Sequence, residues 1–176
     1  MAFNSYVAEP MSTNGIRKIV RAFRKVLKVE FDEYIEVARY LDVLTFIDPM
    51  FDYQIVDDDA LPKSIQGETD VVNHIIRIKQ SVYDGACEGN EYYRMTLAHE
   101  IGHYVLVCID GVTFARNTNR MGYVETFRDP EWQATVFASE FLAPSYLIEG
   151  LDGEEVSKRF GVTIQAANTQ LRHLNK

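Results

Sequence analysis

The chain has 176 residues, of which 47% are hydrophobic and 25% charged, and this is the composition of a globular protein long enough to bury a core of its own. Eighteen basic against 26 acidic residues give a net charge of −8, which excludes broad coating of nucleic acid because phosphate binding depends on cations. Two cysteines, Cys87 and Cys108, exclude a disulfide framework, and no apolar stretch approaches the roughly 20 residues that cross a bilayer.

The first residues have neither the basic nor the apolar segment of a signal peptide. We therefore expect a cytoplasmic protein with one domain over residues 1–176 and no membrane association. Within it the patterns change twice, which predicts an N-terminal helical part (15–59), a core (60–145) and a C-terminal helical pair (146–176).

The N-terminal part opens with a basic amphipathic helix. Apolar residues recur at helical spacing from Ile16 to Val29, and six Lys or Arg side chains occupy the other positions. The segment from Glu30 to Asp59 is acidic, so we expect the two stretches to compensate each other, the alternative being docking of nucleic acid or an acidic partner. A second helix is predicted from Glu33 to Thr45, before Asp48-Pro49.

The core combines strands and helices. Strand character is predicted for Phe51 to Val56 and for Val71 to Lys79, joined by a loop or hairpin connection. A long helix is predicted from Glu91 to Cys108, followed by a polar connection in which Met121 to Phe127 has the pattern of a short strand. Together these elements predict an α+β fold with a small antiparallel sheet packed on helices.

Two further helical stretches complete the chain. Asp129-Pro130 is a typical helix start, and the helix is predicted to end near Ala143, before Pro144. The tail from Asp152 has the apolar rhythm of a helix-turn-helix unit, with Gly161 between its two short helices.

The stretch His99-Glu100-Ile101-Gly102-His103 has the H-E-x-x-H pattern inside an apolar helix. Four residues turn a helix by about 400°, so His99 and His103 project from one face and can bind one metal ion. Glu100 is rotated about 100° further, outside the ligand set but near the position where a general base is needed. The alternative is two structural histidines on a buried helix; unpaired burial of these groups is costly, which favours a metal.

A catalytic zinc takes three protein ligands, so a third must come from elsewhere in the chain. Cys108 lies about 140° from the ligand face, and His74 and His173 have the settings of ordinary strand or surface histidines. Asp129 is predicted to cap a helix, and Glu140 to be a solvent-exposed or supporting carboxylate, whereas Glu125 stays open. Glu131 is favoured because Thr135, Ala138 and Leu142 share its helix face, with Ala134 beside them, so this face can approach the H-E-x-x-H helix.

The segments Thr96 to His103 and Glu131 to Pro144 resemble the ImmA/IrrE family of zinc metallopeptidases, which shows T-x-A-H-E-[IL]-G-H and then E-x-x-A-N-x-F-A-x-E-[LF]-L-x-P. The resemblance covers roughly residues 60 to 175. It departs at Thr135, where asparagine is usual, and at Ala143, where methionine is usual, and these departures leave the substrate details open.

The resemblance implies a zincin-like fold and one zinc ion held by His99, His103 and Glu131, with Glu100 as general base. It also implies a protein substrate: a helix-turn-helix repressor of a phage, mobile element or stress response, which is cleaved or inactivated so that its genes are derepressed.

Several alternatives stay open. An extended substrate is predicted to add as a strand beside the ribbon that contains residues 71–79. Oxyanion donors are sought among four unranked tyrosines: Tyr83, Tyr104, Tyr123 and Tyr146. The C-terminal helical pair is predicted to serve packing or partner docking rather than DNA binding, because it carries few cationic side chains. A metal-stabilised antirepressor that sequesters its partner without proteolysis is the other candidate. Cys87 and Cys108 are expected to be reduced rather than redox sensors.

Overall fold

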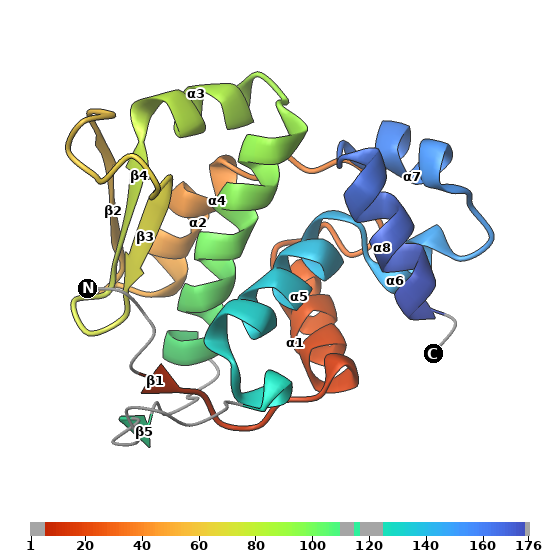
Figure 1. Ribbon diagram of the computed structural model, residues 1–176, viewed down its shortest axis with the longest axis horizontal. Coiled ribbons are helices and arrows are strands. Elements are labelled where there is room, and N and C mark those ends of the chain that lie inside the picture. Colours follow the sequence, from red (N-terminus) through yellow and green to blue (C-terminus); the bar gives the residue numbers. More distant parts are fainter. Residues whose placement is uncertain (1–5, 110–114, 117–124, 175–176) are drawn as a thin grey trace.

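The computed structural model describes residues 6–109, 115–116 and 125–174. A small sheet lies at one end, a layer of longer helices in the middle, and a pair of short helices at the other end (Figure 1). The described helices are α1 Thr13–Val26, α2 Arg39–Ile47, α3 Gln80–Cys87, α4 Glu91–Tyr104, α5 Pro130–Leu142, α6 Ser145–Ile148, α7 Gly153–Phe160 and α8 Ile164–Leu174. The strands are β1 Tyr6–Val7, β2 Asp52–Val56, β3 Gly67–Asp70, β4 Ile75–Lys79 and β5 Ala115–Arg116. The α+β class is confirmed.

The three-stranded sheet is mixed, so the expectation of an antiparallel sheet is wrong. Its order is β2-β4-β3, with β3 antiparallel to β4 and β2 parallel to β4. The chain leaves β2 and returns as β3 on the far side of β4, so that β2 and β4 run in the same direction. Residues 71–74, predicted as strand, form the turn between β3 and β4, where His74 has a φ of 55°.

Helix α4 is the centre of the molecule, and its contacts position the site. It packs against α5, α3 and strands β3 and β4 (Figure 1). Leu97, Ala98 and Ile101 are fully buried, and Phe137 and Phe141 of α5 share the same core. The predicted helix over 91–108 keeps α-geometry only to Tyr104 and continues as a π-helical turn, Val105–Ile109.

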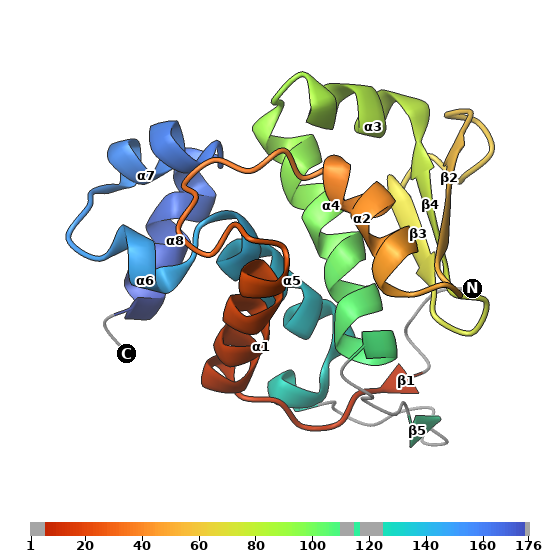
Figure 2. The ribbon, with the colours of Figure 1, turned by 180° about the vertical axis from the view of Figure 1, so that it is seen from behind.

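The connection between α1 and α2, residues 27–38, runs behind the molecule past α6, α7 and α8 (Figure 2). It is held by two fully buried arginines. Arg24 donates to the carbonyls of Phe141 and Asp32, while Arg94 donates to the carbonyl of Phe160 and lies over the ring of Tyr34. These bonds hold the connection in a non-helical path, so α2 begins at residue 39 rather than at residue 33 as predicted.

The basic side chains of α1 are partly paired within the molecule. Arg21 pairs with Glu30, as the acidic neighbouring segment predicts, whereas Arg17 pairs with the more distant Glu140. Arg24 is buried. Three of the six predicted basic positions are therefore paired or buried within the molecule, although Arg21 stays exposed.

The tail forms two short helices as predicted. Asp152 and Glu155 make a capping box at the start of α7, and Gly161 ends this helix in the left-handed conformation. Asp129 caps α5 as expected. The strand predicted over 121–127 lies largely outside the described residues, and Thr126–Arg128 is a 3₁₀ turn. Among the described residues, no helix has the length and apolar character required to cross a membrane.

Candidate metal centre

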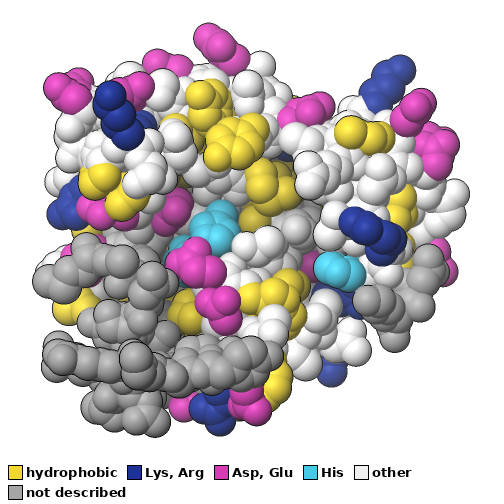
Figure 3. Space-filling view, viewed as in Figure 1, with side chains coloured by type: hydrophobic (Ala, Val, Ile, Leu, Met, Phe, Trp, Pro, Cys, Tyr) yellow, Lys and Arg dark blue, Asp and Glu magenta, His cyan; other side chains and the backbone are white. Residues whose placement is uncertain are grey.

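Three side chains from two helices converge at the surface of α4. His99 Nε2 lies 3.0 Å from His103 Nε2 and 3.1 Å from Glu131 Oε2, and His103 Nε2 lies 3.4 Å from Glu131 Oε1. Histidine and acidic side chains meet near the centre of the exposed face, between the sheet and the helical pair (Figure 3). The histidines come from adjacent turns of α4, and Glu131 lies in the first turn of α5.

Close packing of α4 on α5 brings the carboxylate to the histidines. A Cβ at Gly102 would lie 2.9 Å from Phe137 Cδ1 and 3.2 Å from the Ala134 carbonyl oxygen, so only glycine fits without a shift. Asp129 accepts a hydrogen bond from the Glu131 amide at 3.0 Å and thereby fixes the start of α5. Small residues at the contact, rather than a long side-chain reach, place Glu131 in the cluster.

Thr135 offers an acceptor for a proton on His99 Nδ1. The Thr135 hydroxyl donates to the carbonyl oxygen of Glu131 at 2.8 Å, so its 3.4 Å contact with His99 Nδ1 is one in which the ring donates. With its Nδ1 proton held by Thr135, His99 meets Glu131 Oε2 through Nε2. A cation is needed between these two atoms, either a proton on Nε2 or a metal ion.

The electrostatics favour a cation at this point. Hydrogen bonds from His103 and then His99 hold the pKa of the Glu131 carboxyl far below its usual range, so Glu131 is ionised. His103 is 3% exposed, whereas the Glu131 side chain is 49% exposed, so the cluster has one buried side and one side open to solvent. A ligand can therefore reach the site from solvent.

The donor set fits a metal ion. One ligand atom from each of His99, His103 and Glu131 lies within 4.8 Å of the other two. Bonds of about 2.0–2.1 Å in tetrahedral geometry separate their donor atoms by roughly 3.3 Å, close to the spacings observed here. Two imidazoles and a carboxylate form a set that zinc takes in catalytic sites. Sequence and structure thus select the same three residues as a group that can hold a metal.

Glu100 lies beside this group and outside it. Glu100 is 8% exposed, and its Oε2 accepts a hydrogen bond from Thr69 of β3 at 2.7 Å. Thr69 had no signal in the sequence, because it lies in a short polar strand without alternation of apolar residues. The three ligand candidates therefore come from α4 and α5, whereas the hydrogen bond that holds Glu100 comes from the sheet.

The structure brings none of the other ligand candidates among the described residues into the cluster. Cys108 contacts the Val71 carbonyl, and His74 Nδ1 lies 3.0 Å from the Tyr104 hydroxyl. His173 accepts a bond from Arg17 through its backbone carbonyl. Glu125 forms an ion pair with Arg128.

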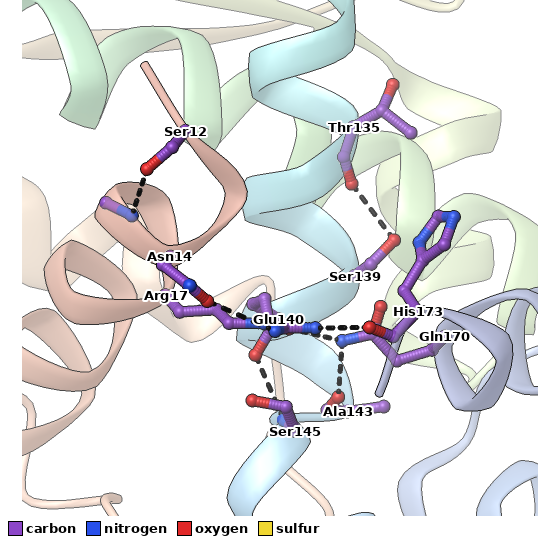
Figure 4. A network of polar contacts seen from close by, with 11 residues as sticks. Ser12, Asn14, Arg17, Thr135, Ser139, Glu140, Ala143, Ser145, Gln170 and His173 are labelled. Atoms are coloured by element: carbon purple, nitrogen blue, oxygen red, sulfur yellow. Dashed lines mark hydrogen bonds and ion pairs between the residues drawn. The ribbon is translucent and has the colours of Figure 1, made fainter. Parts of the chain in front are cut away.

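Glu140 was predicted to be solvent-exposed or supporting; the first is wrong, because the residue is only 2% exposed. Arg17 of α1 and Gln170 of α8 donate to its Oε1 at 2.8 and 2.7 Å, and the Ser145 amide donates to its Oε2 at 3.0 Å (Figure 4). Glu140 thus joins α5 to α1, α6 and α8.

The tyrosines considered as oxyanion donors lie elsewhere. The Tyr104 hydroxyl is buried and donates to Asp48 Oδ2 at 2.6 Å, and that of Tyr146 donates to the Glu30 carbonyl at 2.7 Å. Tyr83 packs against the core, and Tyr123 lies outside the described residues. No hydrogen bond joins a described tyrosine of this set to the three ligand candidates.

Comparison with known proteins gives a fold but no family. No family model matches the chain, and no curated protein sequence matches it. The chain is similar to the solved structure of a Mycobacterium tuberculosis transcriptional regulator, with a TM-score of 0.56 and 18% identity over 90% of this chain. The match covers 48% of that regulator, so the chain spans about half its length. At this identity the similarity shows a shared fold.

Proposed function

We propose that the protein is a zinc-dependent endopeptidase that cleaves or inactivates a regulatory protein, as the resemblance to the ImmA/IrrE motifs implies. The observation that carries the proposal is the convergence of His99, His103 and Glu131, with Glu100 adjacent to the ligand pair and held in place by its own hydrogen bond. A site that served only to stabilise the fold would close its fourth position with another side chain, whereas the described part of the chain supplies three donors and leaves Glu131 half-exposed.

Each residue has a defined part in this proposal. His99, His103 and Glu131 hold the ion. Zinc, when bound, supplies a Lewis acid that polarises the peptide carbonyl and lowers the pKa of water. Glu100 accepts the proton of the attacking water and passes it to the leaving amine.

The sheet offers a binding edge for an extended substrate. The sequence predicts that the substrate adds beside the ribbon that contains residues 71–79, and within this ribbon β4 lies in the middle of the sheet with both edges paired. Among the described strands, β3 has an edge that no neighbour occupies, and β3 packs directly on α4. We therefore assign the substrate strand to β3 (67–70), where backbone pairing would align a peptide with Glu100.

The test is incubation of the protein with the helix-turn-helix repressor encoded beside its gene, with zinc or with a chelator. We expect cleavage only with metal, and its loss in Glu100→Gln. Glu149→Gln, an exposed carboxylate in the turn after α6, is the matched control and should cleave normally. Cleavage that persists in the Glu100 variant or in chelator would contradict the proposal.

A second candidate is a regulator that acts by binding rather than by proteolysis. It is favoured by the fold shared with a transcriptional regulator. The Glu100→Gln variant separates the two candidates, because it removes the base and keeps the three ligands. If this variant still releases the repressor from its operator while the repressor stays intact, the binding function is correct.

A further inference from the structure

The Glu100 side chain packs against strand β3. Successive residues of a strand point to opposite faces, so Gly67 and Thr69 share the face toward α4, while Glu68 and Asp70 share the other. Thr69 is 2% exposed. On the opposite face Glu68 forms an ion pair with Arg77 at 2.9 Å. One face of β3 therefore contacts α4, and the other carries a charge pair within the sheet.

Gly67 makes room for the stem of Glu100. A Cβ at this position would lie 2.7 Å from Ile78 Cδ1, 3.1 Å from Glu100 Cγ and 3.2 Å from the Arg77 carbonyl oxygen. The neighbours on two sides belong to β4, so the strand cannot simply move aside. The absence of a side chain at residue 67 therefore lets Glu100 lie against the sheet.

Thr69 holds the head of the same side chain. Its hydroxyl lies 2.7 Å from Glu100 Oε2 and 3.1 Å from the Glu100 carbonyl oxygen. A hydroxyl has one proton to donate, and the carboxylate oxygen is both closer and the stronger acceptor. No other hydrogen bond reaches the Glu100 carboxylate within the described part of the chain. One oxygen is thus held, and Oε1 is left to accept a proton.

We propose that Thr69 is a positioning residue for Glu100, which turns one carboxylate oxygen toward β3 so that the other faces the ligand bound at the metal. This inference rests on the proposed function, because it assigns Glu100 the role of base. It also links the two uses of β3: the strand that we assign to substrate pairing carries the hydroxyl that orients the base.

The test uses benzohydroxamate, a metal-directed probe whose hydroxamate proton is accepted by a carboxylate placed as a general base. Zinc affinity is measured by competition with a chromophoric chelator, and hydroxamate affinity of the zinc-loaded protein by calorimetry. In Thr69→Val, which keeps the shape and removes the donor, we expect hydroxamate affinity to fall about tenfold, as for loss of a hydrogen bond to a charged group. Zinc affinity should stay within about twofold of the wild type, because Thr69 contacts none of the ligands.

Three further variants make the result specific. Thr69→Ser retains the hydroxyl and should restore hydroxamate affinity. Glu100→Gln should lower it as Thr69→Val does, and the double variant should show no further loss. Thr45→Val is the matched control, because within the described residues the Thr45 hydroxyl bonds only to its own helix, at the Asp42 carbonyl. If Thr69→Val does not fold, Thr69→Ala gives the same comparison.

The outcomes separate this inference from the proposed function. If Glu100→Gln weakens hydroxamate binding and the Thr69 variants do not, the positioning role is wrong and the function stands. If Thr69→Val weakens zinc and hydroxamate binding equally, Thr69 is only structural and the inference is again overturned. If the wild type binds no zinc, or binds zinc but no hydroxamate, the proposed function and the inference that rests on it both fall.

Discussion

Thr135 sets the tautomer of a metal-ligand candidate through a single hydroxyl. Its O–H donates to the Glu131 carbonyl, so in the contact with His99 Nδ1 the hydroxyl oxygen can only be the acceptor. Partners of this kind orient imidazole ligands, and their loss typically lowers metal affinity by about 10–100-fold. For Thr135→Val we therefore expect at least a tenfold loss of zinc affinity in chelator competition.

Two variants control that experiment. Thr135→Ser keeps the hydroxyl and should bind zinc like the wild type. Ser139→Ala removes a hydroxyl one turn further along α5 and should have no effect. Among the residues that the structure describes, this hydroxyl bonds only to the Thr135 carbonyl. Equal zinc affinity in the valine variant would show that His99 needs no partner at Nδ1.

The two cysteines differ in burial and therefore in the reactivity of their thiols. Burial, reinforced by the negative charge of Asp48, raises the pKa of the Cys108 thiol to about 11, whereas Cys87 is exposed. At pH 8 Cys108 is therefore almost entirely protonated and slow to react, because the thiolate is the nucleophile. We expect a fast and a slow phase with a disulfide reagent, and loss of the fast phase in Cys87→Ser. Two fast thiols would contradict this.

Among the elements, α4 is tied to α2 through a hydrogen bond that depends on pH. The Tyr104 hydroxyl, followed by the Met50 amide, lowers the pKa of Asp48 below its ordinary value of 3.8. A carboxyl with a lowered pKa in the folded state stabilises the fold above the unfolded value, and this contribution is lost as pH falls through the folded value. Asp48→Asn should therefore lower the free energy of unfolding by about 1 kcal/mol at pH 7.

The difference between wild type and Asp48→Asn should be constant above about pH 5 and shrink as the pH falls below 4. Urea denaturation at several pH values measures it. Asp59→Asn, an exposed carboxylate whose side chain makes no hydrogen bond among the described residues, is the control and should differ little from the wild type. A stability difference that grows toward acid pH would contradict the assignment of Asp48.

The same elements show what a sequence can predict and what it cannot. His99 and His103 share a face because helix periodicity is local, and Glu131 follows from a capped helix start and small residues on one side. Gly67 and Thr69 do not follow, because β3 is a strand only through its pairing with β4 and its packing on α4. Helix α3 also has no side-chain cap to mark its start.

Glu140 illustrates the limit at longer range. On its own helix it faces away from the metal ligands, which was correctly predicted from the periodicity of α5. Its partners Arg17 and Gln170 lie in other helices, 123 and 30 positions away, and no local pattern in the sequence indicates them. Contacts of this kind are set by tertiary packing rather than by spacing.

At the scale of the whole molecule, Glu140 links the C-terminal pair to the rest. Glu140→Gln keeps the shape and removes the charge that Arg17 and Gln170 face, so we expect a loss of about 2–3 kcal/mol in the free energy of unfolding. We also expect faster tryptic cleavage at Lys158 and Arg159 of α7, because the pair would open more often. Glu154→Gln, an exposed carboxylate of α7, is the control. Unchanged stability and cleavage would show that the pair is held by apolar packing alone.

The distance in sequence between α1 and its partner α5 has a consequence for synthesis. Arg24 bonds to Phe141, 117 positions later, so the apolar face of α1 stays uncovered until α5 has been synthesised. During that interval Ile16, Val20 and Phe23, all buried in the finished protein, face water or a chaperone. Translation that stops before α5 therefore yields an aggregation-prone fragment rather than a smaller working protein.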